Sequence, residues 1–359
     1  MDDVFFMRKA LDLASLGAGF TSPNPMVGAV IVKRGRIVGI GYHKKKGDKH
    51  AEIKAIEDAA GHLEGSTLYI NLEPCVHYGA TPPCAPVVAK AGIRRVVISN
   101  LDPNPLVQGK GVELLKNSGV EVEVGLLEEE GRFLNRFFFK YMQTGLPYLI
   151  LKAALTLDGY IADLPGVSQW ISGEDSREFV HKLRGEVDAI MVGKGTVIKD
   201  NPELTPRRIY APKLPFRVIV AMKPFDSYDY KIFRNPEKLL IVTSERVKWE
   251  LPDNVKNQII FVRVEEQEGK LNLREALKKL GEIGIQSIIC EGGSILFGEL
   301  IRQNLPDELV IFYAPIILGE GLRVFSGFAR DLGNPLKAFR VYETIKFKDD
   351  IMVRYLRYE

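Results

Sequence analysis

The sequence predicts an α/β protein built from two domains. The chain has 359 residues, more than a single hydrophobic core usually organises. Short apolar segments with strand character alternate with amphipathic helical segments along its length. This pattern breaks at Gly145-Leu146-Pro147 and then starts again. We therefore expect a first domain at residues 1–145 and a second at residues 148–359.

The first domain is predicted to be a sheet with helices on its faces. A helix at Val4–Leu16 precedes the order β-β-α-β-α-β-α-β, and a last helix is expected at Leu126–Met142. Proline is tolerated at the first position of a helix, and Pro83 is placed to be such a residue. Cys84 is therefore expected in the first turn of that helix. Strands are expected at Val27–Val32, Ile37–Tyr42, Thr67–Asn71, Val96–Ser99 and Val120–Val124, and helices from His50 onward, at Cys84–Ala91 and at Gly109–Asn117.

The second domain shows the same alternation of strands and helices, without an internal repeat. Its strands are expected at Tyr148–Ala154, Ala189–Val192, Val218–Val220, Leu239–Val242, Ile259–Val262, Ser287–Cys290, Glu308–Tyr313 and Ile351–Leu356. Its main helices are expected at Ser176–Arg184, Leu273–Glu282 and Ser294–Arg302. This pattern again predicts a sheet covered by helices.

The composition is that of an ordinary globular protein, with 46% apolar and 26% charged residues. The formal charge of +3 gives no electrostatic case for a nucleic-acid-binding surface. Three cysteines cannot form a disulfide framework, and their odd number suits a reducing compartment. The N-terminus is acidic, unlike a signal peptide, and no apolar run approaches the ~20 residues that span a bilayer. We expect a soluble cytoplasmic protein that binds neither nucleic acid nor membrane.

One imidazole and two thiols form a pattern typical of a catalytic zinc site. The segments are His50-Ala51-Glu52, Pro74-Cys75 and Pro82-Pro83-Cys84. The three ligands His50, Cys75 and Cys84 leave the fourth zinc position open for water. The pattern matches the zinc deaminase signature H-x-E…P-C-x-x-C, except that eight residues separate the cysteines in place of two.

Glu52 is the predicted catalytic residue of this site. Zinc lowers the pKa of bound water from about 16 towards 7, which supplies a nucleophile at neutral pH. Glu52 would take the water proton, protonate the ring nitrogen and later protonate the leaving amine. A structural zinc site and unrelated reduced cysteines are the alternatives. Both parts of the metal site, the His50 segment and the cysteine segment, fall at predicted helix N-termini. The helix dipole would therefore lower the pKa values of the thiols.

Three further side chains are candidate substrate contacts in this cleft. Asn24 lies in a Pro-Asn-Pro turn and could hydrogen-bond a base edge, although turn formation explains it equally well. His43 and His77 stand near the ligands in sequence, and packed or surface histidines are the alternative. The loop Asp102–Pro105 could close over the site or form a plain tight turn.

Glycine pairs in the second domain indicate a nucleotide site. Gly193-Lys194-Gly195-Thr196 and Glu291-Gly292-Gly293-Ser294 each follow a predicted strand and precede a predicted helix. Backbone N–H groups in such turns can approach a phosphate at a helix N-terminus. The chain has no complete G-x-G-x-x-G and no Walker motif. A simple turn explains either pair alone, and the two together favour a nucleotide.

Both halves resemble the bifunctional riboflavin-biosynthesis deaminase–reductase family, which has the long cysteine spacing seen here. The first half carries Pro23–Gly28, His50–Glu52 and Pro74-Cys75…Pro82-Pro83-Cys84; the second carries Lys152–Gly159, Gly193–Val197, Asp200–Thr205 and Glu291–Gly293. The resemblance implies a cytidine-deaminase-like three-layer α/β/α domain followed by a dihydrofolate-reductase-like α/β domain. It also implies zinc and NADPH as cofactors.

The resemblance further implies two consecutive reactions on a pyrimidine that carries a ribose phosphate. The first deaminates 2,5-diamino-6-ribosylamino-4(3H)-pyrimidinone 5′-phosphate, and the second reduces the ribosyl group to a ribityl chain. NADPH would be bound by Ala154, Trp170, Thr196, Asp200, Gly292, Gly293 and Ser294. The sugar phosphate would be bound by Ser168, Arg184, Leu204, Arg207 and Glu291. The reduction also needs a proton carrier near the ring oxygen of the ribose, for which Lys152, Asp200 and Glu291 are our candidates; Lys152 could instead simply flank a buried strand.

Two other functions fit part of the sequence. A zinc deaminase of a nucleoside or tRNA base could carry a non-catalytic binding domain, although the near-neutral charge disfavours a nucleic acid. A zinc-held interaction protein would need a fourth, closing ligand. The oligomeric state is open, and a homo-oligomer is compatible with the sequence.

Overall fold

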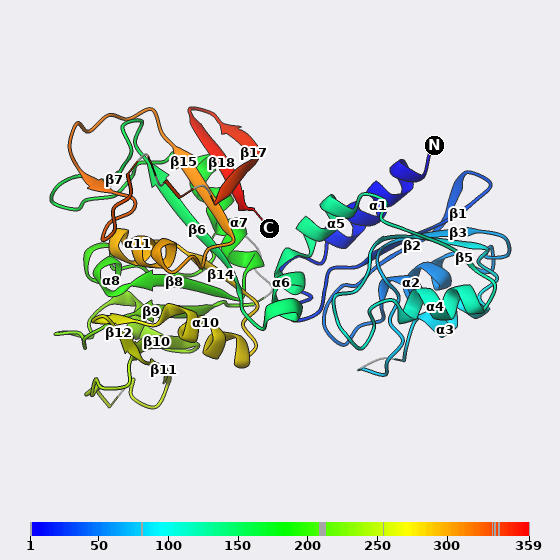
Figure 1. The fold of residues 1–359 in the computed structure, drawn as a ribbon, viewed down its shortest axis with the longest axis horizontal. Helices are drawn as coiled ribbons and strands as arrows, with labels where there is room; N and C mark the ends of the chain where they lie inside the picture. Colours follow the sequence, from blue (N-terminus) through cyan, green and yellow to red (C-terminus); the bar gives the residue numbers. More distant parts are fainter. Residues whose placement is uncertain are drawn as a thin grey trace. The chain divides into compact units, whose positions relative to one another are not determined.

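The computed structural model describes residues 2–79, 82–207, 213–253, 255–331, 333, 335–336 and 338–358. The chain folds as two compact units, Met1–Gly145 and Leu146–Glu359. Each unit is a sheet flanked by helices, so the predicted α/β class is confirmed (Figure 1). Gly145 takes the left-handed conformation (φ 69°) that ends the last helix of the first unit. Within the described residues, no helix has the length and apolar character needed to cross a membrane.

The first unit is a five-stranded sheet in the order β2-β1-β3-β4-β5. β1 runs antiparallel to β2 and β3, while β3, β4 and β5 are parallel. The predicted order of strands and helices is confirmed. The strands are β1 (Gly28–Lys33), β2 (Arg36–Tyr42), β3 (Thr67–Leu72), β4 (Arg95–Asn100) and β5 (Glu121–Val124), and the helices are α1 (Asp3–Ser15), α2 (Ala51–Asp58), α3 (Ala85–Lys90), α4 (Lys110–Asn117), α5 (Glu128–Leu134) and α6 (Arg136–Thr144).

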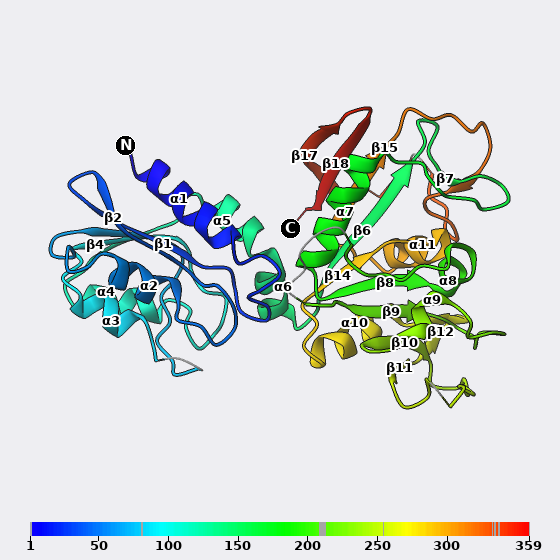
Figure 2. The same cartoon turned by 180° about the vertical axis from the view of Figure 1, so that it is seen from behind.

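Two of the hydrophobic clusters of this unit lie on opposite faces of the sheet. The alternation of strand side chains sends Ile31 and Ile70 towards α2, α3 and α4, and sends Val30 and Val97 towards α1. Figures 1 and 2 show α1 and α5 on one face and α2, α3 and α4 on the opposite face. At Gly41 a Cβ would lie 2.3 Å from the carbonyl oxygen of Ala51, so this glycine lets α2 start directly against β2.

Two helix boundaries differ from the sequence-based expectation. The single helix expected over Leu126–Met142 is wrong, because Asn135 interrupts it and separates α5 from α6. The Asn135 side chain accepts a hydrogen bond from Met26 N and donates one to Met26 O, both 2.8 Å long. Cys84 is the residue preceding α3 and not part of its first turn, and the proline in that turn is Pro86.

The second unit contains a nine-stranded sheet in the order β11-β10-β9-β8-β14-β6-β15-β18-β17. The strands from β11 to β15 are parallel, and β18 and β17 form an antiparallel edge. Its strands are β6 (Tyr148–Leu155), β8 (Ala189–Gly193), β9 (Phe216–Val220), β10 (Leu239–Ser244), β11 (Ile259–Val264), β14 (Ser287–Cys290), β15 (Glu308–Tyr313), β17 (Phe339–Phe347) and β18 (Asp350–Arg357).

Helices cover both faces of this sheet. α10 and α11 pack through Leu277 and Phe297 onto the larger core, which includes the buried thiol of Cys290. On the other face, Phe179 of α7 lies edge-on to Phe312, with ring centroids 6.2 Å apart. The helices are α7 (Glu174–Glu186), α8 (Lys194–Asp200), α9 (Lys231–Arg234), α10 (Leu273–Glu282) and α11 (Ser294–Arg302).

Several strands of this unit were not predicted from the sequence. β17 has no fully buried residue, so it shows none of the apolar runs used to recognise strands. The paired strands β7 (Tyr160–Ala162) and β16 (Leu322–Arg323), and β12 (Glu266–Gln267) and β13 (Lys270–Leu271), are too short for a periodic pattern. β14 lies between β8 and β6, so the loops after these central strands meet at one edge of the sheet.

Candidate active sites

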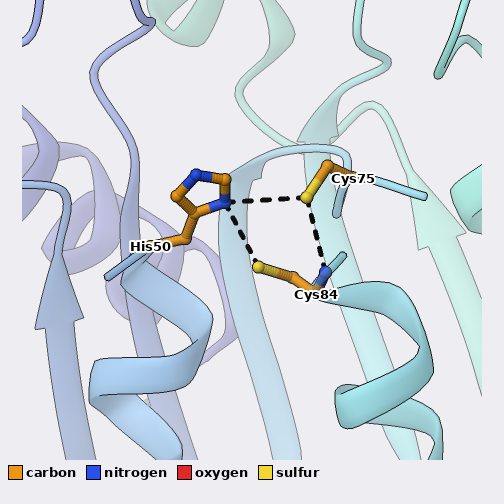
Figure 3. Close-up of side chains that lie close together, drawn as sticks. All are labelled: His50, Cys75 and Cys84. Atoms are coloured by element: carbon orange, nitrogen blue, oxygen red, sulfur yellow. Dashed lines mark hydrogen bonds between the residues drawn. The ribbon is translucent and has the colours of Figure 1, made fainter. Parts of the chain in front are cut away.

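His50, Cys75 and Cys84 come together in the first unit (Figure 3). The Cys84 Sγ lies 3.2 Å from His50 Nδ1, and the Cys75 Sγ lies 3.6 Å from the same nitrogen. The three ligand atoms all lie within 4.8 Å of one another. One imidazole and two thiols at this separation fit a zinc ion and leave its fourth position open.

Local structure places each of the three ligands. His50 is the N-cap residue of α2, and Cys84 is the N-cap residue of α3. Cys75 lies in the loop after β3, where its carbonyl accepts a hydrogen bond from Ala85 N and its Sγ accepts one from Cys84 N. Hydrogen bonds from Cys84 and His50 lower the pKa of the Cys75 thiol to about 4. Cys75 is therefore ready to bind a metal as a thiolate.

Glu52 lies in the first turn of α2 and is 3% exposed. Its Oε2 is buried without a hydrogen-bond partner among the described residues. Burial and the nearby Cys75 thiolate raise the pKa of Glu52 to about 7. A carboxyl group that titrates near neutral pH and has an unpaired oxygen is suited to carry protons.

Two of the candidate substrate contacts lie together beside the ligands. Asn24 Nδ2 is 3.2 Å from His43 Nε2, and the His43 ring stands edge-on to His50 with a centroid distance of 5.4 Å. Burial lowers the pKa of His43, which favours the neutral ring. His77 is half-buried, and its Nδ1 has no partner within the described part of the chain. The segment after Asp102 is a tight turn, in which Asp102 Oδ1 accepts a hydrogen bond from Asn104 N.

Glu73 is a buried acidic residue near the metal ligands to which the sequence analysis gave no role. Its carboxylate accepts backbone hydrogen bonds from Asp102, Gly109 and Val112 at 3.2, 3.0 and 3.1 Å. The available sequence signal was an acidic residue directly between a buried strand and the Pro74-Cys75 pair. Its partners lie 29 to 39 residues further along the chain, so the sequence alone did not indicate this contact.

The second unit contains a cavity of about 1440 Å³ at the carboxyl ends of its central strands. This volume accommodates a dinucleotide together with a substrate. Every residue predicted for the second site lines this cavity: Lys152, Ala154, Ser168, Trp170, Arg184, Thr196, Asp200, Leu204, Arg207, Glu291, Gly292, Gly293 and Ser294. The structure therefore brings together side chains that lie up to 142 residues apart in the sequence.

The charged residues of the cavity interact with one another. Arg184 donates to both carboxylate oxygens of Glu291, with its Nε at 2.5 Å and its Nη2 at 2.7 Å. Burial would raise the pKa of Glu291, but Arg184 and Lys152 hold it below its ordinary value. Burial lowers the pKa of Lys152, and the Glu291 charge opposes this effect. The guanidinium group of Arg184, which the resemblance assigns to the sugar phosphate, is thus already bound to Glu291.

The glycine turn between β14 and α11 fits a phosphate group. Gly293 has φ 98°, a conformation that a residue with a side chain rarely adopts. A Cβ on Gly292 would lie 3.1 Å from Thr196 Oγ1, so the absent side chain keeps this part of the wall open. α11 begins directly after this turn, and its first residues, Ser294 to Phe297, line the cavity, so the positive end of the helix lies at the cavity wall. The Ser294 hydroxyl is already engaged, by Arg323 O and Ser326 Oγ.

The remaining predicted residues line the same cavity. Asp200 accepts a hydrogen bond of 3.3 Å from Ser168, and burial raises the pKa of Asp200. Trp170 is 64% exposed, with the Arg177 guanidinium 4.7 Å from its ring centroid. Such an exposed aromatic face at a cavity wall can stack on a planar ring. Leu204 is buried, and Arg207 lies at an exposed part of the rim.

The fold and its two sites define a bifunctional enzyme, a metal-dependent deaminase joined to a reductase. Comparisons with known proteins agree. Residues 1–100 match the cytidine and deoxycytidylate deaminase zinc-binding region, and residues 147–351 match the RibD C-terminal domain. The riboflavin biosynthesis protein RibD of Aquifex aeolicus is 42% identical over 99% of both chains, and that of Escherichia coli is 38% identical over 90% of both.

Solved structures are similar over the whole chain. Acinetobacter baumannii RibD covers 99% of both chains with a TM-score of 0.89 at 35% identity. The Thermotoga maritima diaminohydroxyphosphoribosylaminopyrimidine deaminase/5-amino-6-(5-phosphoribosylamino)uracil reductase covers 99% of this chain and 98% of its own, with a TM-score of 0.87 at 39% identity. The chain belongs to the RibD family.

Family membership establishes the predicted function. The protein is a bifunctional deaminase and reductase of riboflavin biosynthesis, with zinc and NADPH as its cofactors and a small molecule as its substrate. The first unit is the cytidine-deaminase-like domain, and the second is the RibD reductase domain. The alternative of a non-catalytic second domain is therefore wrong.

Proposed function

We propose that the two sites act consecutively on one pyrimidine carrying a ribose phosphate. The deaminase site would convert 2,5-diamino-6-ribosylamino-4(3H)-pyrimidinone 5′-phosphate to 5-amino-6-(5-phosphoribosylamino)uracil and ammonia. The reductase site would then reduce the ribosyl group of that uracil to a ribityl chain. The name of the Thermotoga maritima enzyme contains both activities in this order. The observation that carries the first step is the unpaired Oε2 of Glu52 beside the His50, Cys75 and Cys84 cluster.

In the deaminase site, His50, Cys75 and Cys84 would hold zinc, which supplies Lewis-acid activation of water. Glu52 takes a proton from the attacking water and delivers it to the ring nitrogen of the pyrimidine. The same carboxyl then carries a proton to the departing amine, so that ammonia leaves. Asn24, oriented by its hydrogen bond with His43, contacts the edge of the base. His77 is a second candidate contact, because its Nδ1 lacks a partner among the described residues.

In the reductase site, the cavity residues would hold NADPH, which would supply the hydride that reduces C1′ of the opened ribose. Lys152 is our candidate for the group that holds the proton needed at the ring oxygen, and Asp200 is a second candidate in the same cavity. Glu291 stabilises the Lys152 ammonium and is itself fixed by Arg184. Arg207, an exposed residue that lines the cavity, is the candidate ligand of the substrate phosphate, because a guanidinium group binds phosphate oxygens.

The proposed cofactor contacts are those that the resemblance to the reductase family implies, and all of these residues line the cavity. The Gly292–Ser294 turn and Thr196 would bind the pyrophosphate of NADPH, because the helix α11 starts there. Trp170 and Ala154 would contact the planar rings of the cofactor. Ser168 and Leu204, which line the same cavity, would contact the sugar phosphate of the substrate.

Two variants test the assignment by separating the activities. Glu52→Gln should retain zinc but lose ammonia release by about 10²–10⁴-fold, since it removes the proton carrier. Lys152→Met should lose NADPH oxidation by a similar factor and leave ammonia release intact. The reductase activity of Glu52→Gln, assayed on deaminated substrate, is the control for that variant. The ammonia release of Lys152→Met is the control for the other. Loss of zinc in Glu52→Gln, or unchanged reduction in Lys152→Met, would contradict these roles.

A cytoplasmic location is proposed from the cysteines. Cys75 and Cys84 must stay reduced to bind a metal, and all three cysteines are free thiols in the structure. A reducing compartment meets this need. Fractionation of cells with an activity assay for ammonia release tests the location.

A further inference from the structure

Glu73 connects the metal-binding loop to the rest of the deaminase unit. It follows the last residue of β3 and is separated from Cys75 only by Pro74. Proline fixes its own φ, which removes one of the backbone rotations between Glu73 and Cys75. The Glu73 residue is 3% exposed, and its backbone N–H donates to Asn100 O at 3.0 Å.

Both carboxylate oxygens of Glu73 are used. Oε2 accepts hydrogen bonds from Asp102 N and Gly109 N, and Oε1 accepts one from Val112 N. The donors belong to the turn after β4 and to the first turn of α4. Hydrogen bonds to an ionised acceptor are stronger than neutral ones. One side chain thus fixes the start of α4 and the loop before it against the end of β3.

A second observation shows how closely α4 sits against this segment. A Cβ on Gly111 would lie 2.3 Å from the carbonyl oxygen of Pro74 and 3.0 Å from Glu73 Cγ. Any larger residue at position 111 would push the Glu73-Pro74 segment and α4 apart. The Glu73-Pro74 segment, which leads into Cys75, therefore packs directly against the first turn of α4.

Cys75 is consequently held from two sides. On one side, Ala85 N donates to its carbonyl at 3.0 Å, and Cys84 N donates to its Sγ at 3.4 Å. On the other side, only Pro74 lies between Cys75 and the anchored Glu73. We propose that Glu73 is a positioning residue of the metal site, which fixes Cys75 at the distance from His50 and Cys84 that zinc requires. This inference rests on the proposed assignment of these three residues as the zinc ligands.

Glu73→Gln tests the proposal, because glutamine keeps the size of the side chain but offers one acceptor and one donor in place of two acceptors. At least one backbone N–H then faces an N–H₂ group. Residues that orient metal ligands typically change metal affinity by about 10–100-fold when altered, so we expect a loss in this range. Zinc affinity is measured by competition with a chromophoric chelator, without any activity assay.

The matched control is Asp3→Asn, which removes another carboxylate of the same unit. Asp3 accepts hydrogen bonds from Tyr69 Oη and Arg95 Nη2 and lies on α1, on the face of the sheet away from α2 and α3. We expect a lower unfolding free energy but wild-type zinc affinity for this variant. A Glu73→Gln protein with no greater loss of zinc affinity than Asp3→Asn would overturn the proposal and leave Glu73 a scaffold residue.

Cobalt substitution gives a readout of ligand geometry. The visible d–d and thiolate charge-transfer bands of bound Co²⁺ should shift in Glu73→Gln and stay unchanged in Asp3→Asn. If Glu73→Gln does not fold, Gly111→Ala displaces the same segment without removing the carboxylate, and it should lower zinc affinity in the same assay. Unchanged affinity there would likewise overturn the proposal. Cys75→Ser distinguishes a failure of this proposal from a failure of the ligand assignment on which it rests. Wild-type zinc affinity in Cys75→Ser would refute the assignment of Cys75 as a zinc ligand.

Discussion

The guanidinium of Arg184 and the carboxylate of Glu291 form a two-point ion pair on the wall of the reductase cavity. Arg184 also donates to Thr205 O, so each of its three nitrogens has an acceptor in the structure. Glu291 acts electrostatically on the buried Lys152 as well. One carboxylate therefore stabilises two cations, and its removal affects both.

The pair leads to a prediction for the pH dependence of the reductase. Burial lowers the pKa of Lys152, and the negative charge of Glu291 raises it again. Glu291→Gln removes the raising effect and leaves the Arg184 charge, which lowers the Lys152 pKa further. If Lys152 must be protonated to act, the alkaline limb of the NADPH oxidation profile should move to lower pH. The profile is measured as kcat/KM with deaminated substrate.

Glu299→Gln provides the matched control for this shift. Glu299 lines the same cavity but pairs with Arg302 and Lys270, not with Lys152. Its replacement should leave the alkaline limb where it is in the wild type. An unmoved limb in Glu291→Gln, or an equal shift in both variants, would show that Glu291 does not set the Lys152 pKa.

Removing the metal should separate the two activities. Among the described residues, the His50, Cys75 and Cys84 cluster is the one group of histidine, cysteine and acidic side chains arranged to hold a metal. A chelator should therefore abolish ammonia release and leave NADPH oxidation on deaminated substrate unchanged. It should also lower the stability of the deaminase unit, because zinc binds the folded form.

Readdition of zinc is the control for chelation. It should restore ammonia release and stability together, as expected for a reversible metal site. A parallel loss of both enzyme activities would instead place a required metal in the reductase unit.

The clustering of His50, Cys75 and Cys84 could be predicted because its sequence signals are local. His50 and Glu52 are two residues apart at a helix start, and each cysteine follows a proline in a loop after a recognisable element. The reductase residues required the resemblance to a family, since a pair of glycines after a strand is a common turn. The Arg184–Glu291 ion pair spans 107 residues, and no local pattern marks which arginine meets which acid.

The helix break at Asn135 shows a second limit of prediction from the sequence. Residues on both sides of it have helical periodicity, so the pattern predicts one continuous helix. The break is stabilised by contacts with Met26, 109 residues earlier in the chain. Asn71 donates to the same carbonyl at 2.9 Å and accepts from Gly28 N. The loop that carries Asn24 is thus fixed by two buried asparagines, and tertiary hydrogen bonds override the helical pattern.

Asn135→Ala should therefore destabilise the deaminase unit by about 2 kcal/mol, because it leaves the Met26 N–H without its acceptor. Both tryptophans, Trp170 and Trp249, lie in the reductase unit, so their fluorescence reports that unit alone. In urea, the circular dichroism transition of the deaminase unit should move to lower concentration, while the fluorescence transition stays in place. Asn117→Ala, at an exposed position at the end of α4, should change neither transition. A fluorescence transition that moves with the circular dichroism signal, or no movement of either, would show that Asn135 does not specifically stabilise the loop of the deaminase unit.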